Sequence, residues 1–192
     1  MANNTVKILG IDPGINHTGW ALGVYRLDTQ STTIQNYGLI EAASLARKES
    51  KEQTKTFGNV FSLHLYEREM RALLKTVNPD YVACEDAFMH KFPQAFVSLK
   101  LCISVIQRVL YEDYGKILHL IPPMVAKLAV WGNGMAKKEA VQEGIRRLED
   151  LTIKHTKQRP AESMVEHEAD SIAILYTFVK TILPDLTMQA KK

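Results

Sequence analysis

The chain has 192 residues, of which 46% are hydrophobic; that suffices for one domain with a sizeable core, so we expect a single domain over residues 1–192. The net charge of +3 is mildly basic, which permits a polyanionic partner such as a nucleic acid without requiring one. No apolar run approaches the roughly 20 residues that cross a bilayer, and no charged start precedes an apolar segment, so we expect neither membrane insertion nor secretion.

The first predicted element is a strand within ILGIDPGINHTGWALG, residues 8–23. Its apolar run carries Asp12 to the end of the strand, where a Pro-Gly pair turns the chain. Residues 19–26 and 32–40 follow as extended segments, so the chain begins with a three-stranded meander. Asp12 then lies where a buried strand meets solvent. It either accepts backbone hydrogen bonds within the turn or holds a divalent cation.

Two helices and a strand follow. Residues 47–55 are charged and lack periodicity, which predicts a solvated loop or the lead-in to a helix, and apolar residues at steps of three and four predict an amphipathic helix over 53–77. DYVACE, residues 80–85, is a short apolar segment that we expect to pair in parallel with an earlier strand and to end at Glu85. The helix over 95–109 is apolar around much of its circumference. This indicates packing on the sheet, with a subunit contact as the alternative.

The last third of the chain predicts one more strand and three helices. The strand is GKILHLI, residues 115–121, and helices are expected over 125–131 and 135–151 on either side of a Gly-Asn-Gly turn. A final helix, opened by a capping box from Ser163 to Glu166, runs to about Leu183. The complete order, β-β-β-α-β-α-β-α-α-α, predicts an α/β fold, a mixed sheet with helices on its faces.

Four side chains from distant parts of the chain are candidates for one site. His167 and Asp170 are three residues apart in the last helix and share a face, and Glu166 is four residues from Asp170. Asp12, Glu85 and this pair all lie where core meets solvent. Carboxylates brought together without a cation repel one another, whereas Mg²⁺ takes oxygen ligands together with water and phosphate oxygens. We therefore infer a metal site, with scattered surface carboxylates as the alternative.

The same residues carry a resemblance to a known family, the RuvC-type Holliday-junction resolvases of the ribonuclease-H-like superfamily. The stretch around Asp12 resembles the family's opening strand, CEDAFMHK at residues 84–91 resembles its second motif, and HEADSIAIL at 167–175 resembles its closing acidic helix. The three motifs occur in the family's order across nearly the whole chain. One departure is His167, where many members carry Asp.

The resemblance implies a ribonuclease-H-like mixed sheet with helices on both faces and an endonuclease that resolves four-way DNA junctions. Asp12, Glu85 and Asp170, with His167, would hold two Mg²⁺ or Mn²⁺ ions per active site, and hydrolysis would leave a 5′-phosphate and a 3′-hydroxyl. His167 would be either a ligand or the base that takes a proton from water. Family members are homodimers that nick two strands symmetrically, and the helix after Glu85 is the candidate dimer contact.

The resemblance also implies a DNA-binding surface. Phe88 aligns with an aromatic residue that wedges against bases near the crossover, with a core Phe as the alternative. Lys127 and Lys138 align with basic residues near the DNA backbone. Further candidates for the same surface are Lys91, Lys100, Lys116 and Lys137. Any one of these lysines is otherwise a solvated charge, so the cluster carries the prediction.

Two other functions fit parts of the pattern. An actin-like ATPase or sugar kinase also opens with a strand and an Asp-Gly turn, but it needs a second phosphate loop on a much longer chain. A nuclease for flaps and forks, or a non-catalytic DNA-binding protein on the same fold, is the remaining alternative. Cys84 and Cys102 lie in apolar stretches, which fits a reducing cytoplasm in a bacterium or a virus-infected cell, with an organelle left open.

Overall fold

The computed structural model describes residues 4–89, 93–154 and 163–189 and is built on a six-stranded mixed sheet. The strands are β1 (Thr5–Asp12), β2 (Thr18–Arg26), β3 (Ser31–Ile40), β4 (Tyr81–Glu85), β5 (Leu118–Ile121) and β6 (Leu151–Ile153). Their spatial order is β5-β4-β1-β2-β3-β6. β1, β2 and β3 form the predicted antiparallel meander, and the other three strands pair in parallel with their neighbours. The predicted α/β fold class is confirmed.

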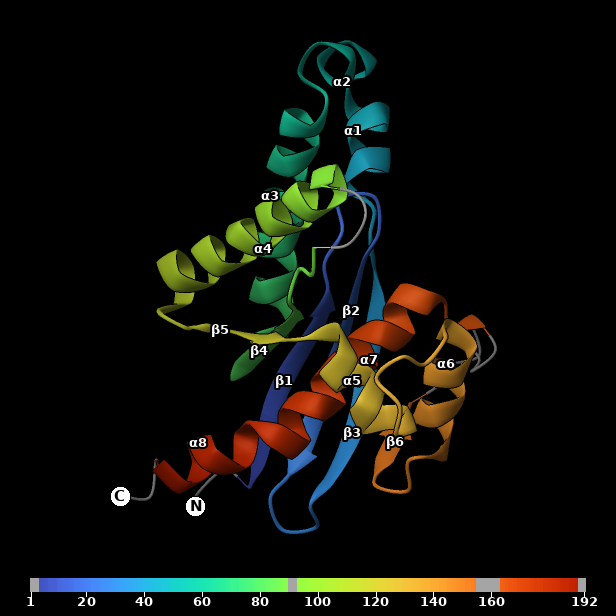
Figure 1. Ribbon diagram of the computed structural model, residues 1–192. Helices are drawn as coiled ribbons and strands as arrows, with labels where there is room; N and C mark the ends of the chain where they lie inside the picture. The colour runs from blue at the N-terminus through green and yellow to red at the C-terminus, as the bar shows by residue number, and fades with distance from the viewer. Residues whose placement is uncertain (1–3, 90–92, 155–162, 190–192) are drawn as a thin grey trace.

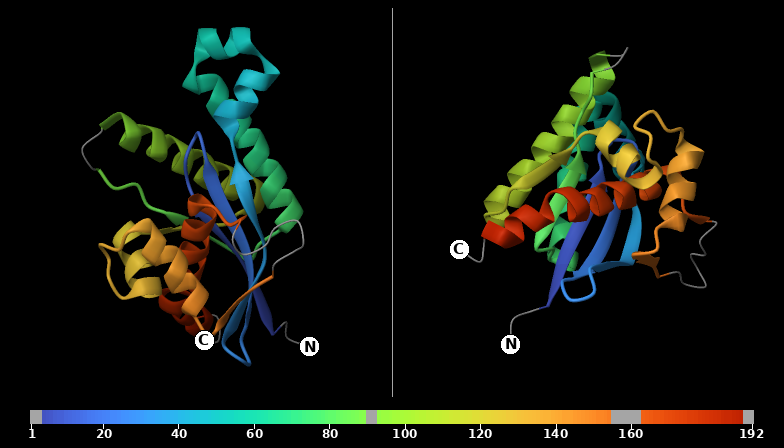
Figure 2. Two further views of the ribbon diagram at one scale, coloured as in Figure 1. Left: turned by 90° about the vertical axis from the view of Figure 1, so that its right-hand side faces the viewer. Right: turned by 60° about the horizontal axis from the view of Figure 1, so that its bottom comes forward.

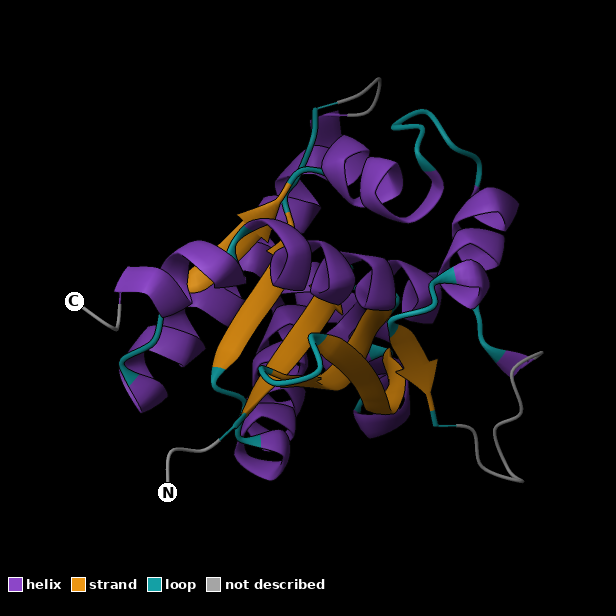
Figure 3. Ribbon diagram, turned by 90° about the horizontal axis from the view of Figure 1, so that it is seen from below, coloured by secondary structure: helices purple, strands orange, loops and turns teal. Residues whose placement is uncertain are grey.

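Helices cover both faces of this sheet (Figure 1). They are α1 (Ala42–Glu49), α2 (Lys51–Phe57), α3 (Asn59–Val77), α4 (Pro93–Tyr114), α5 (Pro123–Trp131), α6 (Lys138–Arg147), α7 (Glu166–Thr181) and α8 (Leu183–Gln189). One apolar core joins the sheet to α5, α6 and α7, and a second joins its other face to α1, α3 and α4. Figure 3 looks along the layers from below and shows helices on both sides of the strands.

The charged stretch predicted as a loop or lead-in is helical. Ser50 begins α2 by accepting a hydrogen bond on its Oγ from the backbone N of Gln53 at 3.1 Å. The helix predicted over 53–77 is divided at Gly58, whose φ of +52° lies in the region that favours glycine. No side chain of α2 is buried. The helices α1 and α2 form an arm that projects beyond the sheet (Figure 2).

Three other boundaries differ from the sequence-based expectation. The strand β6 was not predicted, because three residues are too few to show the alternation of a strand. A helix was expected to continue through these residues, but α6 ends at Arg147. The helix α7 begins at Glu166 with Val165 as its N-cap residue, two residues after Ser163, and Oε2 of Glu168 accepts from the backbone N of Val165 at 3.0 Å. The last helix was expected to run to about Leu183 and to end at Pro184, but α7 ends at Thr181 and Pro184 lies in the first turn of α8, a position that proline tolerates.

The helix α7 lies directly on the backbone of β1 and β2 because glycines face it. A Cβ atom added to Gly10 would lie 2.2 Å from the carbonyl oxygen of Ser171, and one added to Gly19 would lie 1.8 Å from that of His167. Both obstacles are backbone atoms, which cannot rotate away. The two glycines therefore fix how close the first turns of α7 come to the end of β1.

We expect Gly19→Ala to lower the free energy of unfolding by about 1–3 kcal/mol, because the added methyl group must displace the start of α7. Urea unfolding followed by circular dichroism measures the change. Gly38→Ala is the matched control in the same sheet, since the atoms nearest to its added Cβ belong to the side chain of Trp20, the first at 2.9 Å, and not to backbone. Equal losses in the two variants would contradict the argument from the backbone contact.

Among the described residues, α4 alone meets the length and mean hydropathy of a membrane-crossing helix, which the sequence analysis did not anticipate. One such helix is weak support for a membrane span, because helices packed in soluble cores pass the same test. One side of α4 is buried against the sheet and α3, through Cys102, Ile106 and Val109.

Candidate active site

The carboxylates of Asp12 and Glu85 come from neighbouring strands and lie at the same edge of the sheet. β1 and β4 are parallel, with Ile11 opposite Cys84, so the next residue of each strand is an acidic one. Both strands are buried up to this point, and Asp12 itself is buried. The sequence predicts this placement correctly because in each case an acidic residue directly follows an apolar run.

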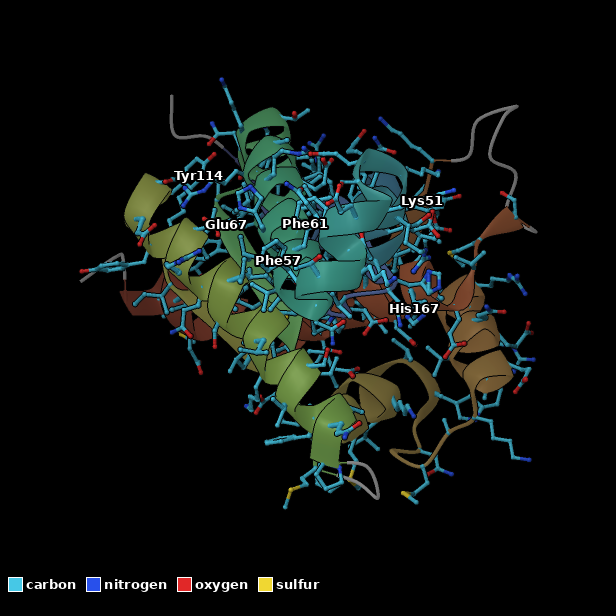
Figure 4. All side chains as sticks on the ribbon, turned by 90° about the horizontal axis from the view of Figure 1, so that it is seen from above. Lys51, Phe57, Phe61, Glu67, Tyr114 and His167 are labelled. Carbon is cyan, nitrogen blue, oxygen red and sulfur yellow. The ribbon has the colours of Figure 1, made fainter. Side chains whose placement is uncertain are left out.

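The helix α7 brings His167 to the same place. The ring nitrogen Nδ1 of His167 lies 2.7 Å from Oδ2 of Asp12, and this hydrogen bond is the main cause of the raised pKa of His167. An ionised carboxylate can only accept a hydrogen bond, so Nδ1 carries a proton. Nε2 is then the ring nitrogen that does not contact Asp12. Figure 4 looks onto this end of the molecule and labels His167 there, at the start of α7.

Glu85 and Asp170 complete an anionic cluster. Burial and the neighbouring charge of Asp12 raise the pKa of Glu85 to about 8 and that of Asp170 to about 7. Two cations oppose the shift, because Lys127 and His167 lower both values. The four predicted residues therefore interact electrostatically, and near neutral pH the cluster binds protons where a metal ion would otherwise balance its charge.

The donor set fits a hard divalent cation that shares its ligands with water and phosphate. Carboxylate oxygens suit Mg²⁺ or Mn²⁺, and the imidazole of His167 is the one donor of another kind in the set. Within residues 4–89, 93–154 and 163–189, no three such side chains already surround one ion position. Mg²⁺ commonly binds through one or two carboxylates and takes its remaining ligands from water and substrate phosphate, so a closed protein cage is not required.

The turn that follows Asp12 is held by Thr18. Its hydroxyl donates to the carbonyl oxygen of Gly14 at 2.6 Å and accepts from the backbone N of the same residue at 3.0 Å. A side chain other than Asp12 thus stabilises the Pro-Gly turn. The ring of His17, in this turn, stacks on the ring of His167 with centroids 5.7 Å apart. The sequence analysis did not single out His17, although it lies only five residues after Asp12.

The predicted DNA-binding residues have different outcomes. Phe88 is 65% exposed in the segment after β4, so the alternative of a core Phe is wrong. Lys127, on α5, is half-buried and close enough to the carboxylates to lower their pKa values. Lys137 is exposed immediately before α6. Lys91 and the side chain of Lys138 lie outside what the structure describes.

Two lysines named for the same surface have other partners. The Nζ of Lys100 lies 2.8 Å from Oδ1 of Asp86, and that of Lys116 donates to the carbonyl oxygen of Pro79. Pro79 precedes β4 and Glu85 ends it, so Lys116 lies at the opposite end of that strand from the carboxylates. Neither lysine adds a free charge to the site, because each already has a hydrogen-bond acceptor. The sequence could not predict this, since it does not show which acceptors the fold brings near each lysine.

Solved structures of known function share this architecture. Thermus thermophilus RuvC aligns with a TM-score of 0.64 at 21% identity, covering 89% of this chain and 92% of that one. The yeast mitochondrial Holliday junction resolvase aligns with a TM-score of 0.60 at 13% identity, covering 90% and 78%. At these identities the likeness concerns the fold, which is ribonuclease-H-like. The chain therefore has the fold that these resolvases share, and its acidic cluster lies at one edge of the sheet.

The family follows from the sequence comparisons. The family model of crossover junction endodeoxyribonuclease RuvC matches residues 8–178. RuvC of Helicobacter hepaticus is 30% identical over 143 residues, covering 74% of this chain and 70% of that protein, and RuvC of Protochlamydia amoebophila is 28% identical over 162 residues, covering 84% and 88%. The chain belongs to the RuvC family. The resemblance seen in the three motifs and the prediction of a hydrolytic nuclease are both confirmed.

Proposed function

We propose that this protein resolves four-way DNA junctions by paired symmetric nicks that leave 5′-phosphate and 3′-hydroxyl ends. Family membership supports the substrate class, and one related structure is of Thermus thermophilus RuvC in complex with Holliday junction substrate. The observation that carries the proposal is the meeting of Asp12, Glu85 and Asp170 at one edge of the sheet, where burial and the neighbouring charge of Asp12 raise the pKa values of Glu85 and Asp170. Cleavage of flaps or forks is the second candidate.

The proposed roles follow from the contacts. Asp12, Glu85, Asp170 and His167 would hold the divalent cations, two Mg²⁺ or Mn²⁺ ions in our proposal. When bound, such ions lower the pKa of an attacking water and neutralise charge on the phosphate. In the neutral imidazole, the bond to Asp12 keeps the proton on Nδ1, and Nε2 then either binds a cation or accepts a proton from water. Lys127 contributes a positive charge beside the carboxylates and attracts the DNA backbone.

Incubation with end-labelled DNA tests the proposal. A four-way junction, a fork and a linear duplex of matched sequence are each combined with Mg²⁺, with Mn²⁺ or with chelator. We expect paired nicks in the junction with either metal and no cleavage with chelator. Faster cleavage of the fork would favour the second candidate, and cleavage that persists in chelator would contradict the metal site.

Phe88 and Lys127 are the described residues that we propose as DNA contacts beside the cut site. The exposed ring of Phe88 lies three residues after Glu85, within reach of bases opened at a crossover. Lys91, Lys137 and Lys138 remain predictions from the resemblance.

We expect Lys127→Ala to weaken junction binding. The negative slope of log affinity against log salt concentration should become shallower by about 0.9, which is the value for one lost phosphate contact. Fluorescence anisotropy in chelator at several salt concentrations measures the slope without cleavage. Lys75→Ala, at an exposed position in the last turn of α3, is the matched control. An unchanged slope for Lys127→Ala would remove this lysine from the DNA surface.

We also propose that two copies of the chain associate through α4. Its exposed outer face carries Val97, Leu101, Ser104 and Tyr111, at helical spacings of four, three and seven. Arg108 lies on the same stripe, four residues after Ser104, and its charge is paired with Glu67 of α3, as Asp113 is paired with Arg71. A largely apolar stripe on a helix of 22 residues, with its one cation already paired, suits a self-complementary contact around a two-fold axis.

Val97→Glu should therefore convert a dimer to a monomer and replace paired nicks by single nicks. Burying a carboxylate in an apolar contact costs several kcal/mol, about enough to dissociate a micromolar dimer. Light scattering after size exclusion gives the mass. Val60→Glu on α3 is the control, because Val60 is more exposed, at 71% against 55% for Val97, and lies off the stripe. Equal masses for Val97→Glu and the wild type would contradict the contact.

We propose that residues 1–192 act as one nuclease domain in a reducing cytoplasm. The free thiols of Cys84 on β4 and Cys102 on α4 support this setting, since both are buried in the same apolar core.

A further inference from the structure

A second imidazole lies against the one that binds Asp12. The rings of His17 and His167 are stacked, with planes 18° apart and centroids 5.7 Å apart. His17 comes from the turn after β1 and His167 from the first turn of α7, so the contact joins two separate parts of the site. None of the roles proposed above uses His17.

The position of His17 is fixed from two sides. Its turn is closed by the paired hydrogen bonds between Thr18 and Gly14. Its own Nδ1 lies 3.5 Å from Oε1 of Glu41, the residue that precedes α1. The backbone of His17 therefore belongs to a hydrogen-bonded turn, and its half-exposed ring lies between Glu41 at the base of the arm and the ring of His167.

The ring of His167 needs a flat surface beside it. Its side chain is 39% exposed, and the bond to Asp12 holds the ring at one atom, Nδ1. Rotation about the bond between Cβ and the ring is soft, since this torsion has broad minima. A flat neighbour parallel to the ring restricts that rotation. The location of Nε2, on the far side of the ring from the bond to Asp12, depends directly on the ring plane.

We propose that His17 is a positioning residue for DNA cleavage, whose ring holds the His167 imidazole in one plane and so keeps its Nε2 in one place. The role requires a flat ring at residue 17, and it does not require the nitrogen atoms of that ring. The inference rests on the proposed function for its cleavage readout.

Three substitutions separate the ring from its nitrogens. His17→Phe keeps a flat ring, His17→Gln keeps polar atoms near Glu41, and His17→Ala keeps neither. We expect the Ala and Gln variants to cleave a bound junction about five- to tenfold more slowly in single turnover with Mg²⁺, and the Phe variant to stay within about threefold of wild type. Junction affinity should not change. His64→Ala, at an exposed position on α3, is the control.

A second readout needs neither metal nor cleavage. In chelator, the carbon-bound ring protons of His167 should show a ring-current shift in NMR spectra of the wild type and the Phe variant, and lose it in the Ala and Gln variants. Spectral dispersion confirms that each variant is folded. A wild type that cleaves no junction would count against the proposed function, whereas the spectra test the stacked arrangement independently.

The proposal is overturned by any of three results. His17→Gln cleaving as fast as wild type would show that a polar atom suffices, and His17→Phe cleaving as slowly as His17→Ala would show that the imidazole itself is required. His167 signals that are unchanged in His17→Ala would show that the two rings do not stack in solution.

Discussion

Asp12→Asn abolishes junction cleavage and leaves junction binding intact, which is the largest effect we expect from any single substitution. Asparagine has the shape of aspartate and keeps one oxygen that can accept the hydrogen bond from Nδ1 of His167. It lacks the negative charge, which attracts a divalent cation and which, after burial, is the next largest cause of the raised pKa values of Glu85 and Asp170. We expect the single-turnover rate to fall on the order of 10³-fold or more, with the fold preserved.

Cleavage is measured at saturating enzyme with Mg²⁺, and affinity by anisotropy in chelator. Asp28→Asn is the matched control, since Asp28 lies in the β2–β3 turn, exposed and paired with Arg26. It should cleave at the wild-type rate. An Asp12→Asn protein that retained more than a tenth of the wild-type rate would rule out Asp12 as part of the metal site.

The sequence was sufficient to locate the acidic cluster because each member interrupts a recognisable pattern. Asp12 and Glu85 end apolar runs, and the parallel pairing of those two strands puts both carboxylates at one edge. His167 and Asp170 share one face of a helix that is otherwise packed inward. These are short-range features, and the order of strands and helices along the chain limits the ways in which they can combine.

What the sequence could not show depends on contacts between distant segments. The approach of α7 to the strands rests on backbone contacts at Gly10 and Gly19, which leave no periodic pattern. The sequence alone suggests that Lys100 is a free cation, whereas the fold places Asp86 beside it. His17 acquires its importance only through His167, which is 150 residues away in the chain. The short strand β6 is likewise defined by its partner β3.

Glu85→Gln should both abolish cleavage and stabilise the metal-free protein at alkaline pH. The pKa of Glu85 is about 8 in the folded protein, against an ordinary value of 4.5. A raised acid pKa means that the folded state binds the proton more tightly than the unfolded state does. The stability from this group is therefore full below pH 4.5 and is lost as the pH rises to about 8.

Glutamine is neutral throughout this pH range, so the variant does not lose this stability as the pH rises. In chelator at pH 8.5 we expect Glu85→Gln to exceed the wild type by about 1–3 kcal/mol, or about 2–4 °C in Tm per kcal/mol, and at pH 5 by much less. Addition of Mg²⁺ at pH 8.5 should raise the Tm of the wild type more than that of the variant, because the ion takes the place of the missing proton.

Differential scanning fluorimetry across pH 5 to 8.5, with chelator or Mg²⁺, measures both effects, and cleavage assays measure the loss of rate, expected to exceed about 10²-fold. Glu52→Gln is the control, because Glu52 is exposed on α2. A variant less stable than the wild type at pH 8.5 would show that Glu85 is not held against the charges of Asp12 and Asp170. Unimpaired cleavage would show that the carboxylate at the end of β4 takes no part in holding the cation. A variant that is more stable at pH 8.5 and no longer cleaves would show that Glu85 lowers the stability of the metal-free fold and is needed for the reaction. A variant unchanged in both would show that Glu85 only ends a strand.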